Sequence, residues 1–288
     1  MTTKAAHLEL VTNLTTEAFI GALKRFWAKR GFPQHIYCDN ATNFTGADRE
    51  LKRLKRQFES QQHKTAVINE SSRIGIEFHF IPPRSSSFGG LWEACVKSTK
   101  EILNKVSMDV RITYEEMLTT LAQVEACLNS RPLSPMSSDP NDMQPLTPGH
   151  FLIGGPLEAI PEPDLQHIPC NRLSRWQRMQ RMFQKFWSRW YKEYLPTLQK
   201  RYKWPSPKSN LSAGDMVLLH EDNQPPFKWP IARVTKVITG EDEKVRVAEV
   251  MLDGNVTYRR GIHKLCPLPK PQVDEPCTAS SSLHTELS

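Results

Sequence analysis

Two acidic residues stand in contexts that could support metal-dependent chemistry on phosphates. Asp39 follows a β-prone run, Gln34 to Cys38, which predicts that it lies at the C-terminal end of a strand. Glu93 follows the glycine pair Gly89-Gly90 and opens a segment with the periodicity of an amphipathic helix. Magnesium is usually bound by one or two carboxylates together with substrate phosphates. The pair could therefore hold Mg²⁺, or Mn²⁺ in its place.

Two lysines extend the pattern around Glu93. Lys97 and Lys100 come four and seven residues after it, so a helix places all three on one face. Each feature alone has an ordinary explanation. Asp39 beside Asn40 is typical of a turn, and a Glu–Lys pair four residues apart is a common surface pair worth ~0.2–0.5 kcal/mol. Taken together with the flanking glycines, the four residues favour a metal-dependent catalytic site in which the two lysines bind phosphates of the substrate.

Three stretches resemble the integrase core of retroelement polyproteins, in particular the BEL/Pao group of long-terminal-repeat retrotransposons. They are Asp39-Asn40-Ala41-Thr42-Asn43-Phe44, Phe80-Ile81-Pro82-Pro83-Arg84 and Phe88-Gly89-Gly90-Leu91-Trp92-Glu93-Ala94. The resemblance implies a ribonuclease-H-like α/β fold in which two Asp and one Glu bind two metal ions, and Asp39 and Glu93 match the second and third ligands. It also implies that Lys97 and Lys100 contact DNA, and that the protein acts in DNA integration as a homo-multimer.

The chain departs from that family in two ways. Ala41 stands where the family usually has Gly, in a turn that favours a positive φ angle. The first Asp of the family has no counterpart, and the segment from Lys4 to Val11 resembles the third strand of the fold. We therefore expect an incomplete core that lacks its first two strands. Such a fragment is expected to bind DNA without catalysing strand transfer.

Positive charge is concentrated in one segment. The chain has a net charge of +7, and the stretch from Arg172 to Lys208 alone holds eleven Lys or Arg and one acid. Five of these cations recur at steps of three or four residues, which predicts a basic helix face in contact with DNA phosphates. They are Arg172, Arg175, Arg178, Arg181 and Lys185. An apolar face lies beside it, for which we expect packing rather than contact with DNA; it comprises Met179, Met182, Phe183, Phe186 and Trp190.

The last quarter of the chain has the pattern of a small β module. Four alternating or β-branched runs predict short strands at Leu211–Leu219, Trp229–Val237, Val245–Met251 and Val256–Arg260. Their number and spacing predict a small all-β, SH3-like barrel. The module resembles the domain of uncharacterised function that follows the BEL/Pao integrase core. Its closing cations are equally consistent with phosphate contact and with a plain surface; they are Arg259, Arg260, His263 and Lys264.

The remaining periodic segments complete the expected organisation. Helices are predicted at about residues 16–30, 47–61, 91–106 and 114–129, with Thr15 and Thr113 as caps, and a strand is predicted at Glu77–Phe80. The expected units are a partial catalytic core at 1–133, a connector at 134–170, a basic aromatic-rich helical segment at 171–208, the barrel at 209–268 and a disordered tail at 269–288.

Composition narrows the classes of protein. No apolar run approaches the ~20 residues needed to span a bilayer, and no signal-peptide pattern is present, so we expect a nuclear or cytoplasmic protein without a membrane partner. The six cysteines include no Cys-x-x-Cys, which indicates neither a zinc site nor a disulfide framework. Two functions remain: a metal-dependent DNA strand-transfer enzyme, and a catalytically silent DNA-binding relic or domesticated protein. A ribonuclease-H-like nuclease of another type fits the motifs less well.

Overall fold

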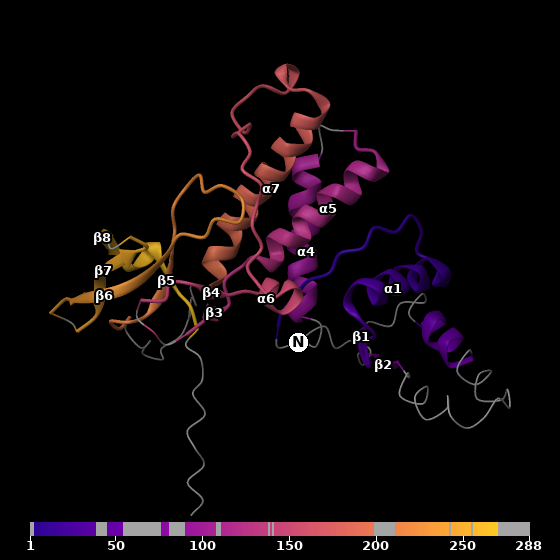
Figure 1. Ribbon diagram of the computed structural model, residues 1–288, viewed down its shortest axis with the longest axis horizontal. Coiled ribbons are helices and arrows are strands. Elements are labelled where there is room, and N and C mark those ends of the chain that lie inside the picture. Colours follow the sequence, from indigo (N-terminus) through magenta and orange to yellow (C-terminus); the bar gives the residue numbers. More distant parts are fainter. Residues whose placement is uncertain are drawn as a thin grey trace, which may run out of the picture.

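The computed structural model describes most of the chain, apart from some internal segments and the two ends. The described residues are 3–38, 45–53, 76–80, 90–107, 111–137, 139, 141–198, 211–241, 243–254 and 256–269, without the side chains of 90–95. A group of long helices forms the centre, an antiparallel sheet lies at one side, and a smaller unit of helical segments and two short strands lies at the other (Figure 1). None of the helices in these ranges is long and apolar enough to cross a bilayer.

Helix α1 (Thr16–Arg30) begins and ends where the sequence predicts. The Thr15 hydroxyl accepts a hydrogen bond from the Ala18 N–H at 3.2 Å, which satisfies one of the free donors of the first turn. Gly31 follows the last turn with φ +88°, a conformation that favours glycine, and its N–H donates to the Trp27 carbonyl at 2.9 Å. The predicted cap at Thr15 is therefore confirmed.

Strands β1 (His35–Cys38) and β2 (Glu77–Phe80) form a parallel pair in which His35 lies opposite Glu77 and Cys38 opposite Phe80. Both strands are confirmed. Parallel neighbours need a long crossover connection, and the helical residues 45–53 lie in that connection. The helix predicted at 47–61 thus starts two residues earlier than expected, and its part beyond residue 53 lies outside the described residues.

The prediction of a strand from Lys4 to Val11 is wrong. This segment pairs with no described strand. Side chains of α5 (Tyr114–Asn129) bond part of its backbone instead: the Leu8 N–H donates to Glu125 Oε2 at 2.9 Å, and Asn129 bonds the N–H and the carbonyl of Ala6. Because buried backbone donors and acceptors require partners of some kind, side chains from a helix can replace a neighbouring strand.

Helices α4 (Gly90–Ser107) and α5 match their predicted ranges within one residue. The start of α5 is fixed by a reciprocal pair of hydrogen bonds. The Thr113 hydroxyl accepts from the Glu116 N–H at 3.3 Å, and the Glu116 carboxylate accepts from the Thr113 N–H at 2.7 Å. The predicted capping box is therefore confirmed.

The segment expected to be a connector contains short ordered elements. Strands β3 (Ser134–Pro135) and β4 (Pro145–Leu146) pair in antiparallel fashion, and α6 (Pro148–Ile153) follows directly. Proline at the first position is preorganised for a helix, and the Thr147 N–H donates to His150 Nδ1 at 3.1 Å. Thr147 therefore caps α6, and Pro148 opens its first turn.

Helix α7 (Arg175–Leu198) follows the short 3-10 helix η2 (Cys170–Arg172). The prediction that Arg172 lies on the basic helix is therefore wrong. The reason is the capping of α7 at Ser174, whose hydroxyl accepts from the Gln177 N–H at 3.3 Å while its own N–H donates to Gln177 Oε1 at 2.9 Å. Because Ser174 is the capping residue, the first helical residue of α7 is Arg175.

The predicted β-rich module forms a five-stranded antiparallel sheet, in the order β8-β7-β6-β5-β9. The strands are β5 (Met216–Leu219), β6 (Ile231–Thr239), β7 (Val245–Leu252), β8 (Val256–Gly261) and β9 (Leu265–Pro267), with η3 (Ile262–Lys264) before the last. Each of the four predicted runs contains a strand, although β5 covers only the last four residues of the run Leu211–Leu219, and β9 is additional. The protein is thus a mixed α/β protein, while the ribonuclease-H-like core and the SH3-like barrel stay predictions.

The main hydrophobic core lies between the helices and this sheet. Its buried members are Ile102, Val124, Cys127, Leu128, Phe183, Phe186, Trp187, Trp190, Tyr191, Leu195, Met216, Leu218, Cys266 and Leu268. The five aromatics among them all come from α7, and Met179 and Met182 are buried too. The expectation that the apolar face of α7 packs is therefore confirmed. Trp187 Nε1 also donates to the Gln224 carbonyl at 2.8 Å, which ties α7 to the loop after β5.

Candidate nucleic-acid interface

The outer face of α4 presents the two lysines singled out in the sequence. Thr99 and Ile102 are buried on the opposite side, at 2% and 0% exposure. That burial turns Lys97 and Lys100 outward, and both are exposed. Neither lysine forms an ion pair with the residues whose side chains are described. Both cations are therefore placed to meet an external anion.

The two predicted metal ligands are described only in part. Asp39 comes directly after β1, but it lies outside the described residues together with the rest of the stretch to Phe44. The backbone of Glu93 belongs to the first turn of α4, one turn before Lys97, and its side chain is not described. Binding of Mg²⁺ or Mn²⁺ by Asp39 and Glu93 therefore stays a prediction.

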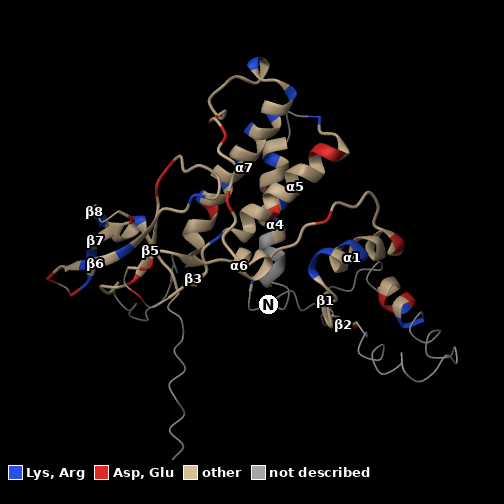
Figure 2. Ribbon diagram, in the orientation of Figure 1, with Lys and Arg blue, Asp and Glu red and all other residues tan. Residues whose placement is uncertain are grey.

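A basic stripe lies along α7, and Figure 2 draws the Lys and Arg positions of this helix in blue. It follows the steps three, four, four and three, so its members share one face; we define it as Arg178, Arg181, Lys185, Arg189 and Lys192. At 1.5 Å per residue the stripe is about 21 Å long. The sequence prediction ended at Lys185 and missed Arg189 and Lys192, although they continue the same spacing.

Arg175 is committed to a partner inside the protein. Its Nε and Nη2 atoms donate to the two oxygens of Glu116 on α5, at 2.5 and 2.9 Å. These bonds from Arg175, followed by the one from the Thr113 backbone, lower the pKa of Glu116 to about 2. Because the carboxylate neutralises the guanidinium locally, Arg175 is a weaker candidate for phosphate contact than the sequence predicts.

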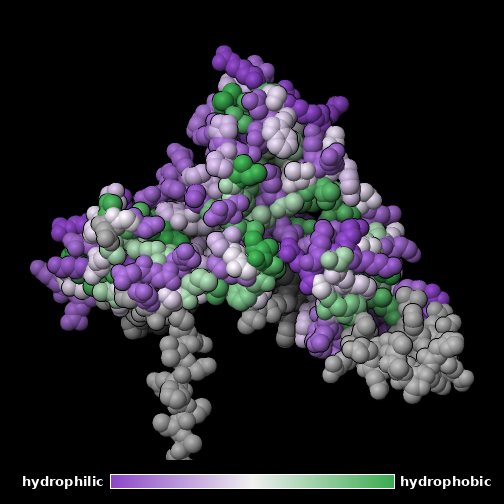
Figure 3. All heavy atoms as spheres, viewed as in Figure 1, coloured by the Kyte–Doolittle hydropathy of each residue, from purple (hydrophilic) through white to green (hydrophobic). Residues whose placement is uncertain are grey.

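Arg178 and Arg181, the first two residues of the basic stripe, contact groups that precede α7 in the sequence. Arg178 Nε donates to the Leu173 carbonyl at 3.2 Å, and Arg181 Nη1 lies 2.5 Å from Cys170 Sγ. Uncharged partners leave the positive charge in place, unlike the carboxylate that faces Arg175. Arg189 and Arg172 are exposed, and Lys185 is half-buried. In Figure 3 the end of the helix group at the top of the view is covered largely by hydrophilic residues.

The far end of the stripe adjoins the sheet, where acids interrupt the positive charge. Lys192 Nζ lies 3.4 Å from Asp222, which lines a cavity of about 300 Å³ together with Leu219, His220, Glu221, Arg260 and Lys264. Arg260 lies 3.6 Å from Glu221. Arg259, for which the sequence left phosphate contact and a plain surface equally open, lies 2.9 Å from Glu249. Of the four cations considered at the end of the sheet, Arg259 and Arg260 therefore face acids.

Comparisons with known proteins add a match of limited extent. A model described as "Family of unknown function (DUF5641)" matches residues 174–268, which run from the cap of α7 to the residue after β9. No curated protein matches the chain. Among solved structures, the chain is similar to one in the simian T-cell lymphotropic virus intasome in complex with PP2A regulatory subunit B56 gamma. The identity is 13% and the TM-score 0.31, over 90% of this chain and 66% of that chain.

Proposed function

We propose that this chain binds duplex DNA through the cations of α4 and α7 and contributes the carboxylates of Asp39 and Glu93 to integrase-type DNA strand transfer. The observation that carries the proposal is the arrangement around α4: Lys97 and Lys100 are exposed one and two turns after the motif residue Glu93. Asp39, placed by the sequence directly after β1, supplies the second carboxylate of the same motif set.

The basic stripe supports binding to duplex DNA by its length and its charge. Base pairs of B-DNA rise 3.4 Å, so a stripe of about 21 Å follows roughly six of them. Phosphate contacts release condensed counterions, and each contact makes log affinity fall with log salt by about 0.9. Binding of this kind depends on phosphates and is expected to show little preference for sequence.

The proposed chemistry is divided between the carboxylates and the lysines. Asp39 and Glu93 would hold Mg²⁺ or Mn²⁺, which supplies charge stabilisation at a phosphodiester. Lys97 and Lys100 would bind phosphates next to the reacting bond and so orient the DNA end. Homo-multimer formation on two DNA ends belongs to the same proposal.

Binding can be tested by fluorescence anisotropy with a labelled duplex over a range of salt concentrations. Arg178→Gln with Arg189→Gln should reduce the slope of log affinity against log salt by about 1.8. Lys24→Gln with Lys244→Gln is the matched control, because it removes the same charge from exposed positions on α1 and in the turn before β7. Equal losses in both variants would mean that net charge alone drives binding.

Catalysis can be tested by a strand-transfer assay in Mg²⁺ or Mn²⁺, with the chain alone and joined to the sequence encoded upstream. Glu93→Gln is expected to abolish transfer and to leave DNA affinity within about twofold, since one carboxylate outside the basic stripe adds little to phosphate binding. Transfer that survives Glu93→Gln would contradict the assignment of this site. DNA binding without transfer in either form would favour the alternative, a catalytically silent DNA-binding protein.

A further inference from the structure

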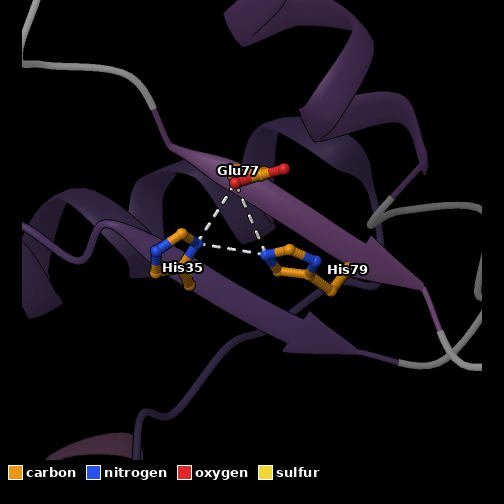
Figure 4. Close-up of side chains that lie close together, drawn as sticks. All are labelled: His35, Glu77 and His79. Carbon is orange, nitrogen blue, oxygen red and sulfur yellow. Dashed lines mark hydrogen bonds and ion pairs between the residues drawn. The ribbon is translucent and has the colours of Figure 1, made fainter. Parts of the chain in front are cut away.

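Two histidines and a glutamate meet on one face of the β1–β2 pair, away from the basic stripe (Figure 4). His35 Nδ1 lies 3.1 Å from His79 Nε2 and 3.3 Å from the nearer oxygen of Glu77. The same Glu77 oxygen lies 3.7 Å from His79 Nε2. Three atoms of the kinds that bind metal ions thus form a small triangle at the start of both strands.

The parallel register explains why these side chains converge. His35 lies directly opposite Glu77, and His79 is two residues further along the same strand, so all three share a face. Tyr37, opposite His79, stacks on its ring with centroids 4.5 Å apart and planes inclined by 15°. That stacking holds the His79 ring where Nε2 faces the other two ligand atoms.

The size of the triangle matches the coordination shell of a zinc-type ion. Tetrahedral Zn²⁺ lies about 2.0–2.1 Å from imidazole nitrogens and carboxylate oxygens, so its ligand atoms are separated by roughly 3.4 Å. The three separations here are 3.1, 3.3 and 3.7 Å. One ion could therefore bind all three atoms after side-chain shifts of a few tenths of an ångström.

We propose that His35, Glu77 and His79 form a binding site for a divalent transition-metal ion of the zinc type. Imidazole nitrogens favour Zn²⁺, Co²⁺, Ni²⁺ and Cu²⁺ over Mg²⁺, which prefers oxygen ligands. The site is thus separate in chemistry from the carboxylate pair proposed to hold Mg²⁺. The side chains are 52%, 65% and 34% exposed, in the order His35, Glu77 and His79, which leaves room for water as a further ligand.

Metal at this site would join two strands that are distant in the sequence. The ligands come from β1 and β2, which are separated by residues 39–76. Because an ion that binds only the folded arrangement stabilises it by mass action, the metal would strengthen the strand pair that leads into Asp39. The proposed site is therefore a structural metal site at the surface that links β1 to β2 and leaves one coordination position for water.

The test uses the full chain, with Zn²⁺ in titration calorimetry and Co²⁺ in visible spectroscopy. We expect one tight equivalent, tetrahedral Co²⁺ bands without thiolate-to-metal charge transfer, and a higher melting temperature with Zn²⁺. His35→Gln and Glu77→Gln should each weaken binding by at least about tenfold. His167→Gln is the matched control, because His167 is 85% exposed and lies in the segment before η2.

Three results would overturn the proposal. One is no binding of Zn²⁺ or Co²⁺ by the unmodified chain, which would leave only a hydrogen-bonded cluster. Another is unchanged affinity in both His35→Gln and Glu77→Gln. A third is a Co²⁺ spectrum dominated by cysteine ligands. Circular dichroism checks that each variant is folded, and the two substituted side chains are more than half exposed, so folding is expected to survive.

Discussion

The side chain of Asn129 and the backbone of Ala6 are joined by two hydrogen bonds that run in opposite directions. The Ala6 N–H donates to Asn129 Oδ1 at 2.7 Å, and Asn129 Nδ2 donates to the Ala6 carbonyl at 2.8 Å. Asn129 is 1% exposed and ends α5. One buried amide therefore supplies both contacts that a neighbouring strand would give to this residue, and it fixes the N-terminal segment against the helix.

Replacing Asn129 by alanine should destabilise the protein by about 1–3 kcal/mol, because a half-buried donor and a half-buried acceptor of Ala6 both lose their partner. Urea denaturation followed by circular dichroism measures the change. Asn104→Ala on the exposed face of α4 is the control and should change stability by less than about 0.5 kcal/mol. A small effect at Asn129 would mean that water replaces the lost bonds.

Acid should weaken the contact between Glu125 and the N-terminal segment. Burial alone would raise the pKa of Glu125, but hydrogen bonds from His7, the Leu8 N–H and Arg30 outweigh it and lower the pKa to about 2, from an ordinary 4.5. A lowered pKa means that the ionised carboxylate stabilises the fold. This stabilisation, at most about 3 kcal/mol, is complete above pH 4.5 and is lost as the pH falls towards 2.

The check is the free energy of unfolding measured from pH 7 to pH 2. Glu125→Gln should be less stable at pH 7 and should lose less stability on acidification than the unmodified chain. Glu158→Gln, at an exposed position between α6 and η2, should follow the unmodified chain throughout. Parallel curves for Glu125→Gln and the unmodified protein would show that this carboxylate does not govern the acid transition.

Trp187 and Trp176 lie on the same helix, but truncation to alanine should lower the stability of the protein much more at Trp187 than at Trp176. Trp187 is 1% exposed and packs against Phe227 and Trp229, with ring centroids at 6.0 and 5.2 Å. Trp187→Ala should therefore cost about 3–5 kcal/mol. Trp176 is 61% exposed, so Trp176→Ala should cost less than about 0.5 kcal/mol. Thermal unfolding distinguishes them, and similar losses would contradict the packing of α7.

Glu116→Gln should increase the affinity for duplex DNA. Glu116 now neutralises Arg175 through two hydrogen bonds, and a neutral amide would leave the guanidinium charge available to phosphate. The salt dependence should steepen by about 0.9, the value of one further phosphate contact. Anisotropy titrations measure both quantities. Glu115→Gln, at the exposed neighbouring position in α5, is the control, and an equal gain there would indicate a general effect of charge.

Local signals in the sequence were sufficient to predict α1, α4 and α5 and their starts, but not α6 or the start of α7. Thr15 and Thr113 cap helices because each places a hydroxyl where free N–H groups occur, and this chemistry is complete within four residues. The apolar face of α7 was equally readable, since burial follows a period of 3.6 residues. The strands of the sheet were marked by β-branched runs between turn residues.

Features that depend on distant residues could not be predicted. The segment from Lys4 to Val11 has the alternation of a strand, but its partners are side chains in α5 more than a hundred residues away. Arg175 meets Glu116 only because α5 and α7 pack together. The triangle of His35, Glu77 and His79 requires the register between two strands, for which the sequence carries no direct signal.

The position of α7 between the helices and the sheet has a consequence for how the protein opens. Phe186 and Trp187 belong to one buried cluster with Val124 of α5 and Leu218 of β5. Neither side can separate from α7 without exposing the same aromatic surface to water. Amide hydrogen exchange in α5 and in β5 should therefore report a single cooperative opening with one free energy, rather than two independent ones.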